Sequence, residues 1–455
     1  MAATSDESRL AHPDPSRRQF LKLGSTLLPL SAAASSALLS TAQADTSPNT
    51  QQKTQAKIVI VGSGLGGLAA ANRLHRELDG AKITIIDRKQ EHNYQPGYTL
   101  VATGVWSKDK VRDRNRDFIP SGVEWIQEMV VGFEPEKNRV RIESGKTVDY
   151  DYMIIATGLQ LNYTAIEGMD IKAIGDNGLG SVYYSPDAAE ATWKAMDQFR
   201  QKGGQAIMTL PNTFLKCAGA PLKMTFMLDS RLREAGTRKA SKIDFYSALK
   251  NIFSVKVIND EVLKRWQALD IPVHFENQLT AIDIAARKAS FLLPNGQVEQ
   301  REYDFIHVVP PMSAPDVIRQ SVLASTDGVM AKGGWLEVDK KTLQHKRFPN
   351  IFGLGDINGT PRGKTAATIK KSAPIVVQNL LDVMAGKSPS LEFDGYTSCP
   401  LLLREGAALL VEFDGDGNLT PSLPMIEPLQ DSWMAWLMKY RLLKPAYLSV
   451  LKGRV

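Results

Sequence analysis

Several short apolar runs recur along the chain, and each one ends in glycine or in a polar residue. They lie at 57–61, 82–87, 152–156, 205–210 and 350–356. Runs of this length that do not alternate with polar residues are typical of strands buried on both faces of a sheet. An Ala- and Leu-rich stretch at 68–71, between the first two runs, predicts a helix. The pattern therefore predicts an α/β fold.

The segments between these runs are less regular. Strands are expected at 123–131 and 139–142, on either side of Pro135. The stretch 93–100 combines aromatic residues with a Pro-Gly pair, and it is expected to form an ordered loop.

The first apolar run leads into a glycine-rich turn. Gly62, Gly64 and Gly67 fill the pattern G-x-G-x-x-G between a strand and a helix, and Asp87 ends the next strand. In this context the first glycine allows a sharp turn, the second lets the backbone approach a pyrophosphate, and the third lets the helix pack closely. An acidic residue about 20 positions further on accepts hydrogen bonds from ribose hydroxyls. The stretch predicts a dinucleotide site, and the plainer alternative is a glycine-rich turn of some other α/β domain.

Composition narrows the function classes. The chain has 455 residues, 43% of them hydrophobic and 23% charged, which suits a globular protein of two or more domains. The net charge of +6 comes without a clustered Lys/Arg run, so nucleic acid is not an expected partner. Two cysteines are too few for a disulfide framework. Six histidines without a C-x-x-C motif give little basis for a metal site or a covalent haem.

The N-terminal segment has the layout of an export signal. Arg17 and Arg18 are followed by a mildly apolar run at 23–39 and by a small-x-small cleavage site at 42–44. This order is typical of the bacterial twin-arginine class, and the apolar run is short for a membrane span. We therefore expect a signal at 1–44, a polar linker at 45–56, and a protein on the periplasmic side of the inner membrane. A disordered tail with an incidental arginine pair is the alternative.

The ends of two later predicted strands resemble segments of a known protein superfamily. Thr157 and Gly158 end one apolar run, and Gly355 and Asp356 end another. With the opening glycine turn, their order and spacing resemble the flavin disulfide reductase superfamily. The resemblance implies two Rossmann-like domains, an FAD that spans all three segments, and a contact between Asp356 and the ribityl chain of the flavin.

The second glycine turn, which that superfamily uses for a nicotinamide cofactor, is absent. The run at 205–210 leads instead into P-N-T-F-L-K-C-A-G-A-P, which has no pyrophosphate turn and contains Cys217. The departure argues against NAD(P)H as the reductant. Cys399 lies 182 positions further on, from 217 to 399, in D-G-Y-T-S-C-P-L. Taken alone, each cysteine could be a buried small hydrophobe.

The two cysteine segments resemble those of sulfide:quinone oxidoreductases, in the branch that includes the mitochondrial enzymes. Other matching segments are H-V-V-P-P-M-S-A-P-D-V, T-L-Q-H-K-R-F-P-N-I-F-G-L-G-D and K-T-A-A, and the likeness covers about 57–400. It implies oxidation of hydrogen sulfide to sulfane sulfur, with two electrons passing through the cysteine pair and FAD to a membrane quinone. Cys399 would receive the sulfur and Cys217 would face the flavin. Lys216, next to Cys217, could favour a thiolate there.

The resemblance also divides the chain. An FAD-binding domain is expected at 57–160 and 325–390. A second Rossmann-like domain, without a nucleotide glycine turn, is expected at 161–324. A membrane-associating region is expected at 391–455.

The C-terminal region carries an aromatic stripe with basic residues around it. The stripe follows helical spacing and comprises Trp433, Trp436, Leu437 and Tyr440. Lys439 is among its basic neighbours, and Pro445 is expected to break the run. Such a segment suits the surface of the inner membrane, whereas a helix packed on the core is the alternative.

Several points stay open at this level. The flavin subunit of a flavocytochrome c sulfide dehydrogenase resembles the chain in export and fold, but it attaches FAD through a cysteine that the loop at 93–97 lacks. A type II NADH dehydrogenase is disfavoured by the missing second glycine turn. A catalytically silent flavin-binding or sulfur-carrying protein is a third alternative. The sequence does not determine the sulfane-sulfur acceptor or the quinone. It also does not determine the oligomeric state, for which a homo-oligomer is one alternative.

Overall fold

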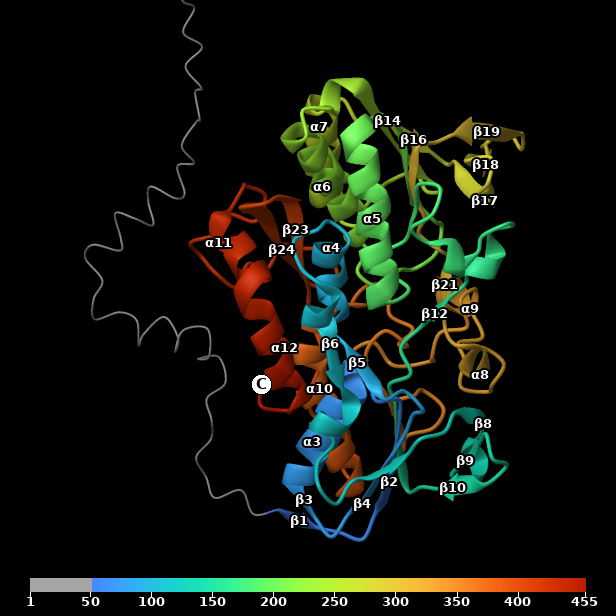
Figure 1. Ribbon diagram of the computed structural model, residues 1–455. Coiled ribbons are helices and arrows are strands. Elements are labelled where there is room, and N and C mark those ends of the chain that lie inside the picture. The colour runs from blue at the N-terminus through green and yellow to red at the C-terminus, as the bar shows by residue number, and fades with distance from the viewer. Residues whose placement is uncertain (1–50) are drawn as a thin grey trace, which may run out of the picture.

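The computed structural model describes residues 51–455 (Figure 1). The predicted export signal at 1–44 lies outside the described residues. Within them the chain forms two parallel five-stranded sheets with helices packed on them, and a C-terminal hairpin followed by helices. The predicted α/β fold is confirmed.

The first sheet has five parallel strands in the order β22-β11-β2-β4-β7. In that order their bounds are Ile351–Gly353, Tyr152–Ile155, Lys57–Val61, Lys82–Ile86 and Glu124–Ile126. Helices α3 (Leu65–Glu77) and α10 (Ala366–Met384) pack against each other beside it. Alternate residues of β2 enter two different cores, for example Ile60 and Val61. This burial on both faces explains why the run does not alternate with polar residues.

The strand expected at 123–131 is wrong, because two strands of two different sheets cover this stretch. β7 joins the first sheet, whereas β8 (Val130–Glu134) pairs with β9 (Arg139–Ile142), which also pairs with β10 (Thr147–Asp149). Polar Gln127 and Glu128 separate the two apolar pieces. The polar pair within the apolar run therefore marks the point where the chain leaves the first sheet and enters another.

The second sheet has five parallel strands in the order β13-β20-β14-β15-β16. In that order their bounds are Leu179–Gly180, Phe305–His307, Gly204–Leu210, Ser241–Ser247 and Val273–Phe275. Its long helices are α5 (Pro186–Lys202), α6 (Ala220–Glu234) and α7 (Lys256–Ala268). An antiparallel sheet flanks it, formed by β17 (Gln278–Asp283), β18 (Lys288–Leu292) and β19 (Val298–Glu302).

Shorter elements fill the connections. The remaining two-residue and three-residue strands are β1 (Gln52–Lys53), β3 (Leu78–Asp79), β5 (Glu91–Asn93), β6 (Arg112–Arg114), β12 (Gln160–Leu161) and β21 (Met312–Ser313). The single-turn helices are α4 (Tyr98–Val101), α8 (Asp316–Arg319) and α9 (Gly328–Ala331). The expected loop at 93–100 is thus partly helical, since η1 (Gln95–Gly97) runs directly into α4.

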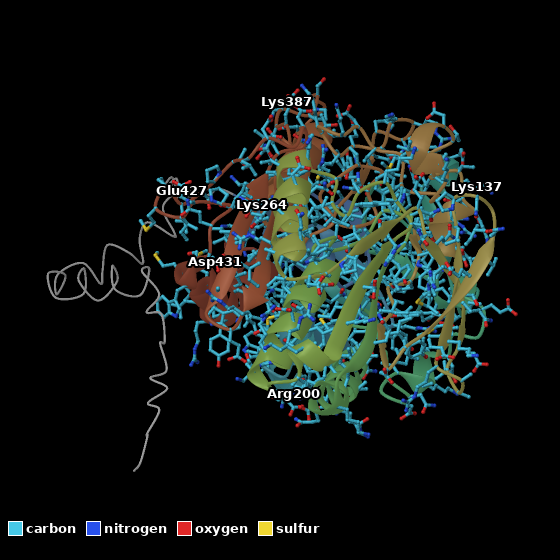
Figure 2. All side chains as sticks on the ribbon, turned by 90° about the horizontal axis from the view of Figure 1, so that it is seen from above. Lys137, Arg200, Lys264, Lys387, Glu427 and Asp431 are labelled. Atoms are coloured by element: carbon cyan, nitrogen blue, oxygen red, sulfur yellow. The ribbon has the colours of Figure 1, made fainter. Side chains whose placement is uncertain are left out.

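The C-terminal region begins with the hairpin β23 (Thr397–Arg404) and β24 (Ala407–Phe413). It continues through α11 (Trp433–Leu437), a π-helical turn η8 (Met438–Leu442) and α12 (Leu443–Leu451). α11 packs on β24, and α12 packs on α3. Seen from above, the flank with Glu427 and Asp431 lies opposite the flank with Lys137 (Figure 2).

The aromatic stripe is largely packed on the protein. Trp436 is only 7% exposed, and Tyr440 stacks on it with ring centroids 5.8 Å apart. Pro445 does not end the helical run, because α12 continues through it to Leu451; the π-helical turn η8 lies directly before α12. No helix in residues 51–455 is both long and apolar enough to cross a membrane.

Candidate functional site

The glycine turn after β2 is packed as a dinucleotide fingerprint requires. Gly62 has a φ of +107°, and a Cβ there would lie 2.5 Å from the Ala156 carbonyl oxygen. A Cβ on Gly67 would lie 1.9 Å from the Gly62 oxygen, so neither position admits a side chain. A Cβ on Gly64 would meet nothing within 4 Å among the described residues. The first and third glycines serve packing, and the second borders open space at the N-terminus of α3.

The three segments expected to contact FAD meet at one edge of the first sheet. β11 pairs with both β2 and β22, so the carboxyl ends of these strands lie side by side. Thr157 and Gly158 follow β11, and Gly355 and Asp356 follow β22. The Thr157 hydroxyl is buried and has no hydrogen-bond partner within the part of the chain that the structure describes. Its unused hydrogen-bonding capacity is available to a ligand at this edge.

Asp87 follows β4 at the same edge. Its Oδ2 accepts hydrogen bonds from the Ser63 amide at 2.7 Å and from the Ser63 hydroxyl at 2.9 Å. Its Oδ1 accepts from the Lys89 amide at 2.9 Å. A carboxylate offers about four lone-pair sites, so Asp87 keeps acceptor capacity for a ribose.

This edge fits the dinucleotide part of FAD. The turn at 62–67 and the N-terminus of α3 can hold a pyrophosphate, because the first amides of a helix have no intrahelical partner and carry partial positive charge. The open position at Gly64 and the unpartnered Thr157 hydroxyl are features that such a ligand would use. Asp87 lies where the ribose would follow.

Asp356 lies beside a buried lysine. Burial raises the pKa of Asp356, and the charge of Lys364 opposes this shift. The Lys364 Nζ donates to the carbonyl oxygens of Asp356 at 2.7 Å and Asn358 at 2.9 Å, and burial lowers its pKa to about 7. The Lys364 carbonyl accepts from the Cys217 amide at 2.9 Å. The Gly-Asp strand end is therefore tied directly to the first cysteine.

Cys217 lies between β14 and α6 in a strained backbone conformation. Its φ is +48°, in the left-handed region, which costs roughly 1–3 kcal/mol for a residue with a side chain. The Ala220 amide donates to its carbonyl at 2.7 Å, and the Tyr183 hydroxyl donates to the same oxygen at 3.2 Å. Strained residues of this kind cluster at functional sites.

Cys399 lies in β23, and its sulfur is within hydrogen-bonding distance of the Cys217 sulfur. Both cysteines are free thiols. A Cβ on Gly219 would lie 2.6 Å from the Cys399 sulfur, so only glycine fits there. Gly219 is the N-cap of α6, which places the sulfur at the positive end of that helix. The fold therefore brings together two cysteines that are 182 positions apart.

A lysine contacts the pair, but it is not the expected one. Lys223, in the first turn of α6, donates from Nζ to the Cys217 sulfur at 3.4 Å. Lys216 donates to the Gln95 side-chain oxygen at 2.7 Å instead, and burial lowers its pKa to about 8. Adjacent side chains point apart here, so the thiolate-stabilising contact comes from Lys223.

The charges of this cluster favour a thiolate at Cys217. The hydrogen bond from Cys399, and then the charges of Lys223 and Lys439, hold the pKa of Cys217 well below that of a free thiol although burial opposes the shift. The same hydrogen bond and burial raise the pKa of Cys399. Burial acts to lower the pKa of Lys223, but the charge of Cys217 and hydrogen bonds to both sulfurs raise it. In the reduced pair, Cys217 is therefore the more acidic thiol and Cys399 the less acidic one.

The C-terminal region supplies the second lysine. Lys439 is 2% exposed, and its Nζ donates to the Pro96 carbonyl at 2.5 Å. Burial, and then repulsion by Lys223, lower its pKa to about 7. The expectation that Lys439 lies among basic residues at a membrane surface is therefore wrong. Lys439 follows the buried Ala435 and Trp436 by four and three positions, so it lies on the helix face that packs on the protein.

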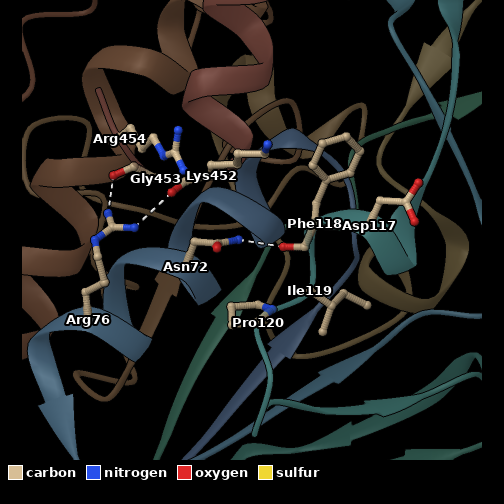
Figure 3. Close-up of a pocket in the computed structure, with 9 residues that line it drawn as sticks. All are labelled: Asn72, Arg76, Asp117, Phe118, Ile119, Pro120, Lys452, Gly453 and Arg454. Carbon is tan, nitrogen blue, oxygen red and sulfur yellow. Dashed lines mark hydrogen bonds between the residues drawn. The ribbon is translucent and has the colours of Figure 1, made fainter.

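A cavity of about 560 Å³ lies away from these residues, beside the ends of α3 and α12 (Figure 3). Arg76 donates to the carbonyls of Lys452, at 2.8 Å, and Gly453. Arg76, Lys452 and Arg454 line the cavity, and none of the predicted site residues does. Helix C-termini favour cations, so the basic lining follows from the two helix ends.

Known proteins resemble the chain over most of its length. It is 37% identical over 368 residues to the mitochondrial sulfide:quinone oxidoreductase of Mus musculus, covering 80% of this chain and 79% of the relative. The mitochondrial enzyme of Dictyostelium discoideum is 37% identical over 403 residues, 88% of this chain and 87% of the relative. Residues 56–202 match the family model for pyridine nucleotide-disulphide oxidoreductases. Together with the site, this defines an FAD-dependent oxidoreductase of the flavin disulfide reductase class. The chain belongs to the sulfide:quinone oxidoreductase family.

A solved structure supports the fold. The sulfide:quinone oxidoreductase of the hyperthermophilic bacterium Aquifex aeolicus superimposes with a TM-score of 0.71 at 20% identity, covering 88% of this chain and 92% of that chain. The predicted fold class is thereby confirmed, and the family model and the relatives confirm the predicted FAD.

The predicted periplasmic location is wrong. The relatives from Mus musculus, Dictyostelium discoideum and Schizosaccharomyces pombe, which are 32–37% identical to the chain, are all mitochondrial enzymes. They point to a mitochondrial location rather than to a bacterial periplasm. The arginine pair that suggested export lies outside the described residues and is a short motif that a basic N-terminal segment can contain by chance.

Proposed function

We propose that the protein oxidises hydrogen sulfide to sulfane sulfur and passes two electrons through its cysteine pair and FAD to a membrane quinone. The observation that carries this proposal is the contact between Cys217 and Cys399 beside Lys223, next to the strand end with Asp356. Two thiols in hydrogen-bonding contact can form and break a disulfide. The family membership supports sulfide as the substrate and a quinone as the electron acceptor.

The reaction begins with an oxidised pair, a Cys217–Cys399 disulfide or a trisulfide with one bridging sulfur. Hydrosulfide attacks the Cys399 sulfur of the disulfide. A new S–S bond forms there as a persulfide, and the bond to Cys217 breaks with its electron pair on Cys217. The leaving group is stabilised as a thiolate by the Lys223 ammonium 3.4 Å away. This direction is favoured because Cys217 is the better leaving thiolate: the charges of Lys223 and Lys439 lower its pKa, whereas the pKa of Cys399 is raised.

Two further steps return the cysteine pair to the disulfide. A nucleophilic acceptor removes the outer sulfur of the persulfide, which leaves a second thiolate at Cys399. The two cysteine sulfurs return to a disulfide when they give up two electrons. FAD held at the edge described above would supply the two-electron acceptor for this step, with the quinone as the final electron acceptor.

We assign FAD binding, the cysteine chemistry and the membrane contact to the domains expected from the sequence. FAD belongs to 57–160 and 325–390, with contacts at Gly62, Gly64, Gly67, Asp87, Thr157, Gly158, Gly355 and Asp356. The region 161–324 supplies Cys217 and Lys223. The region 391–455 supplies Cys399 and Lys439, and its exposed Arg441 and Leu442 contact the membrane.

The proposal is tested with Cys217→Ser and Cys399→Ser. Each variant is expected to lose nearly all sulfide-to-quinone turnover, because neither attack nor disulfide formation is possible with one sulfur. FAD content is the internal control, since the assigned FAD contacts lie elsewhere. Anaerobic titration with sulfide, followed by a soluble quinone analogue, measures both half-reactions. Substantial turnover in either variant would contradict the cysteine relay.

A further inference from the structure

A line of buried hydrogen bonds leads from Asp87 into the protein. The Ser63 hydroxyl donates to Asp87 Oδ2 at 2.9 Å, and Asn115 Nδ2 donates to the Ser63 hydroxyl oxygen at 2.7 Å. Asn115 Oδ1 lies 2.9 Å from His92 Nδ1, and His92 Nε2 lies 2.8 Å from the Tyr447 hydroxyl. The line thus joins the proposed ribose carboxylate to helix α12, which lies beside β5 and β6 (Figure 1).

The direction of every bond in this line is determined. Asn115 Nδ2 also donates to the Lys89 carbonyl at 2.7 Å, and because a carbonyl can only accept, the orientation of the Asn115 amide is fixed. Asn115 Oδ1 therefore accepts, and the hydrogen of His92 sits on Nδ1. Burial lowers the pKa of His92, so the ring is neutral and its Nε2 must accept from Tyr447. All four groups donate in one direction, toward the carboxylate of Asp87.

The four donors are deeply buried. Ser63, His92, Asn115 and Tyr447 are at most 8% exposed. Hydrogen bonds in such a low-dielectric interior polarise one another, and a series that ends on a carboxylate is stronger than isolated neutral bonds. Satisfying buried polar groups alone would not require that all of them point at one anion.

We propose that His92 and Asn115 are positioning residues, which orient Asp87 to bind the ribose of FAD. We propose also that the Tyr447 hydroxyl couples this orientation to the docking of helix α12. The proposal rests on the assignment of Asp87 to FAD. Docking of the C-terminal helix and binding of FAD then stabilise each other, since coupling between two binding events is reciprocal. The C-terminal region would therefore complete both the cysteine site and the cofactor site.

The experiment uses Tyr447→Phe, which removes only the hydroxyl and keeps the ring packed between Tyr94 and His92. We expect FAD to bind about threefold to tenfold more weakly, as for the loss of one buried hydrogen bond. In hydrogen exchange, FAD should protect the amides of 443–451 in the wild type and protect them less in the variant. Both readouts are independent of turnover.

The matched control is Tyr163→Phe. Its hydroxyl is also buried and also hydrogen-bonds a side chain, that of Ser181 at 2.7 Å, but it has no connection to the line. This variant should lose stability without a change in FAD affinity. Equal FAD affinities in Tyr447→Phe, Tyr163→Phe and the wild type would overturn the proposal.

A double-mutant cycle separates the line from simple packing. Ser63→Ala removes the hydroxyl that joins Asn115 to Asp87 but keeps the amide that also bonds this carboxylate. In the Ser63→Ala background, Tyr447→Phe should no longer weaken FAD binding. Additive effects of the two changes would show that Tyr447 acts outside the line and would refute the proposal.

A further variant, Asp87→Ala, distinguishes failure of this proposal from failure of the assignment of Asp87 to FAD. Asp87→Ala should weaken FAD binding more than Tyr447→Phe does. If Asp87→Ala leaves FAD affinity unchanged, the assignment of Asp87 to FAD fails and the proposal fails with it. If Asp87→Ala weakens FAD binding and Tyr447→Phe does not, only the positioning line is overturned.

Discussion

At the scale of single residues, Lys223 is the cation in contact with Cys217. It is the cation that donates to the sulfur, and it faces both thiols from the first turn of α6. Lys216 is adjacent to Cys217 in sequence but bonds Gln95. The two lysines therefore form a natural pair for comparison.

In the reduced protein, Lys223→Met should raise the pKa of Cys217 by about 1–3 units, the usual effect of removing an opposite charge at this distance. A depressed thiol pKa means that the thiolate persists at lower pH and is protonated only as the pH falls through that pKa. The pH profile of iodoacetamide alkylation should therefore move to higher pH in Lys223→Met and stay in place in Lys216→Met. Equal shifts in both variants would contradict the assignment.

The sequence alone does not reveal these lysines. The cysteine pair was proposed only through the family resemblance, because spacing does not show that two residues 182 positions apart touch. Lys223 could have been anticipated, since a helix that begins at Ala220 places it in the first turn, above the cysteine loop. Lys439 was missed because a lysine is seldom fully buried, although it follows the buried Ala435 and Trp436 by four and three positions.

At the scale of elements, predictions succeeded where burial on both faces leaves an unbroken apolar run. The strands at 57–61 and 152–156 are central in the first sheet, and they were predicted almost to the residue. The stretch 123–131 failed because β7 and β8 are short edge strands of two sheets. Short edge strands carry a weaker pattern, since neighbours rather than periodicity decide their pairing.

The turn η8 also exposes a small surface that we assign to the membrane. Leu442 is 43% exposed and Arg441 is exposed beside it. Replacing both by Glu should weaken binding to vesicles with anionic lipid about tenfold or more, because an apolar side chain and a favourable charge are both lost. Reduction of FAD by sulfide should be unchanged.

A flotation assay with these vesicles measures the effect, and sulfide bleaching of the flavin gives the internal check. Val298→Glu on β19 is the control, since Val298 is 63% exposed but belongs to the antiparallel strands far from α11. Vesicle binding that stays at the wild-type level in the double variant would place the membrane contact elsewhere.

At the scale of the whole molecule, the site depends on the C-terminal region for its construction. Trp436, Tyr447 and Leu451 are buried against earlier parts of the chain, and Lys439 reaches the cysteines. Each large apolar side chain contributes roughly 1.5–3 kcal/mol when buried. Their sum approaches the entire stability of about 5–15 kcal/mol that a native protein has.

Removal of 432–455 should therefore cost folding and FAD together. Thermal unfolding and the flavin-to-protein ratio measure this outcome, and removal of 454–455 alone serves as the control. A protein without 432–455 that is cooperatively folded and yellow would show that the C-terminal helices are a dispensable attachment.

The distance in sequence between Cys217 and Lys439 also has a consequence during synthesis. The two positions are 222 residues apart, from 217 to 439. At translation rates of about 5–20 residues per second, Cys217 exists for roughly 10–45 s before Lys439 has been made. During that interval Cys217 lacks Cys399 for part of the time and Lys439 throughout, and it reacts as a more ordinary thiol. The full charge environment of Cys217 is therefore assembled only after the C-terminal helices have been synthesised.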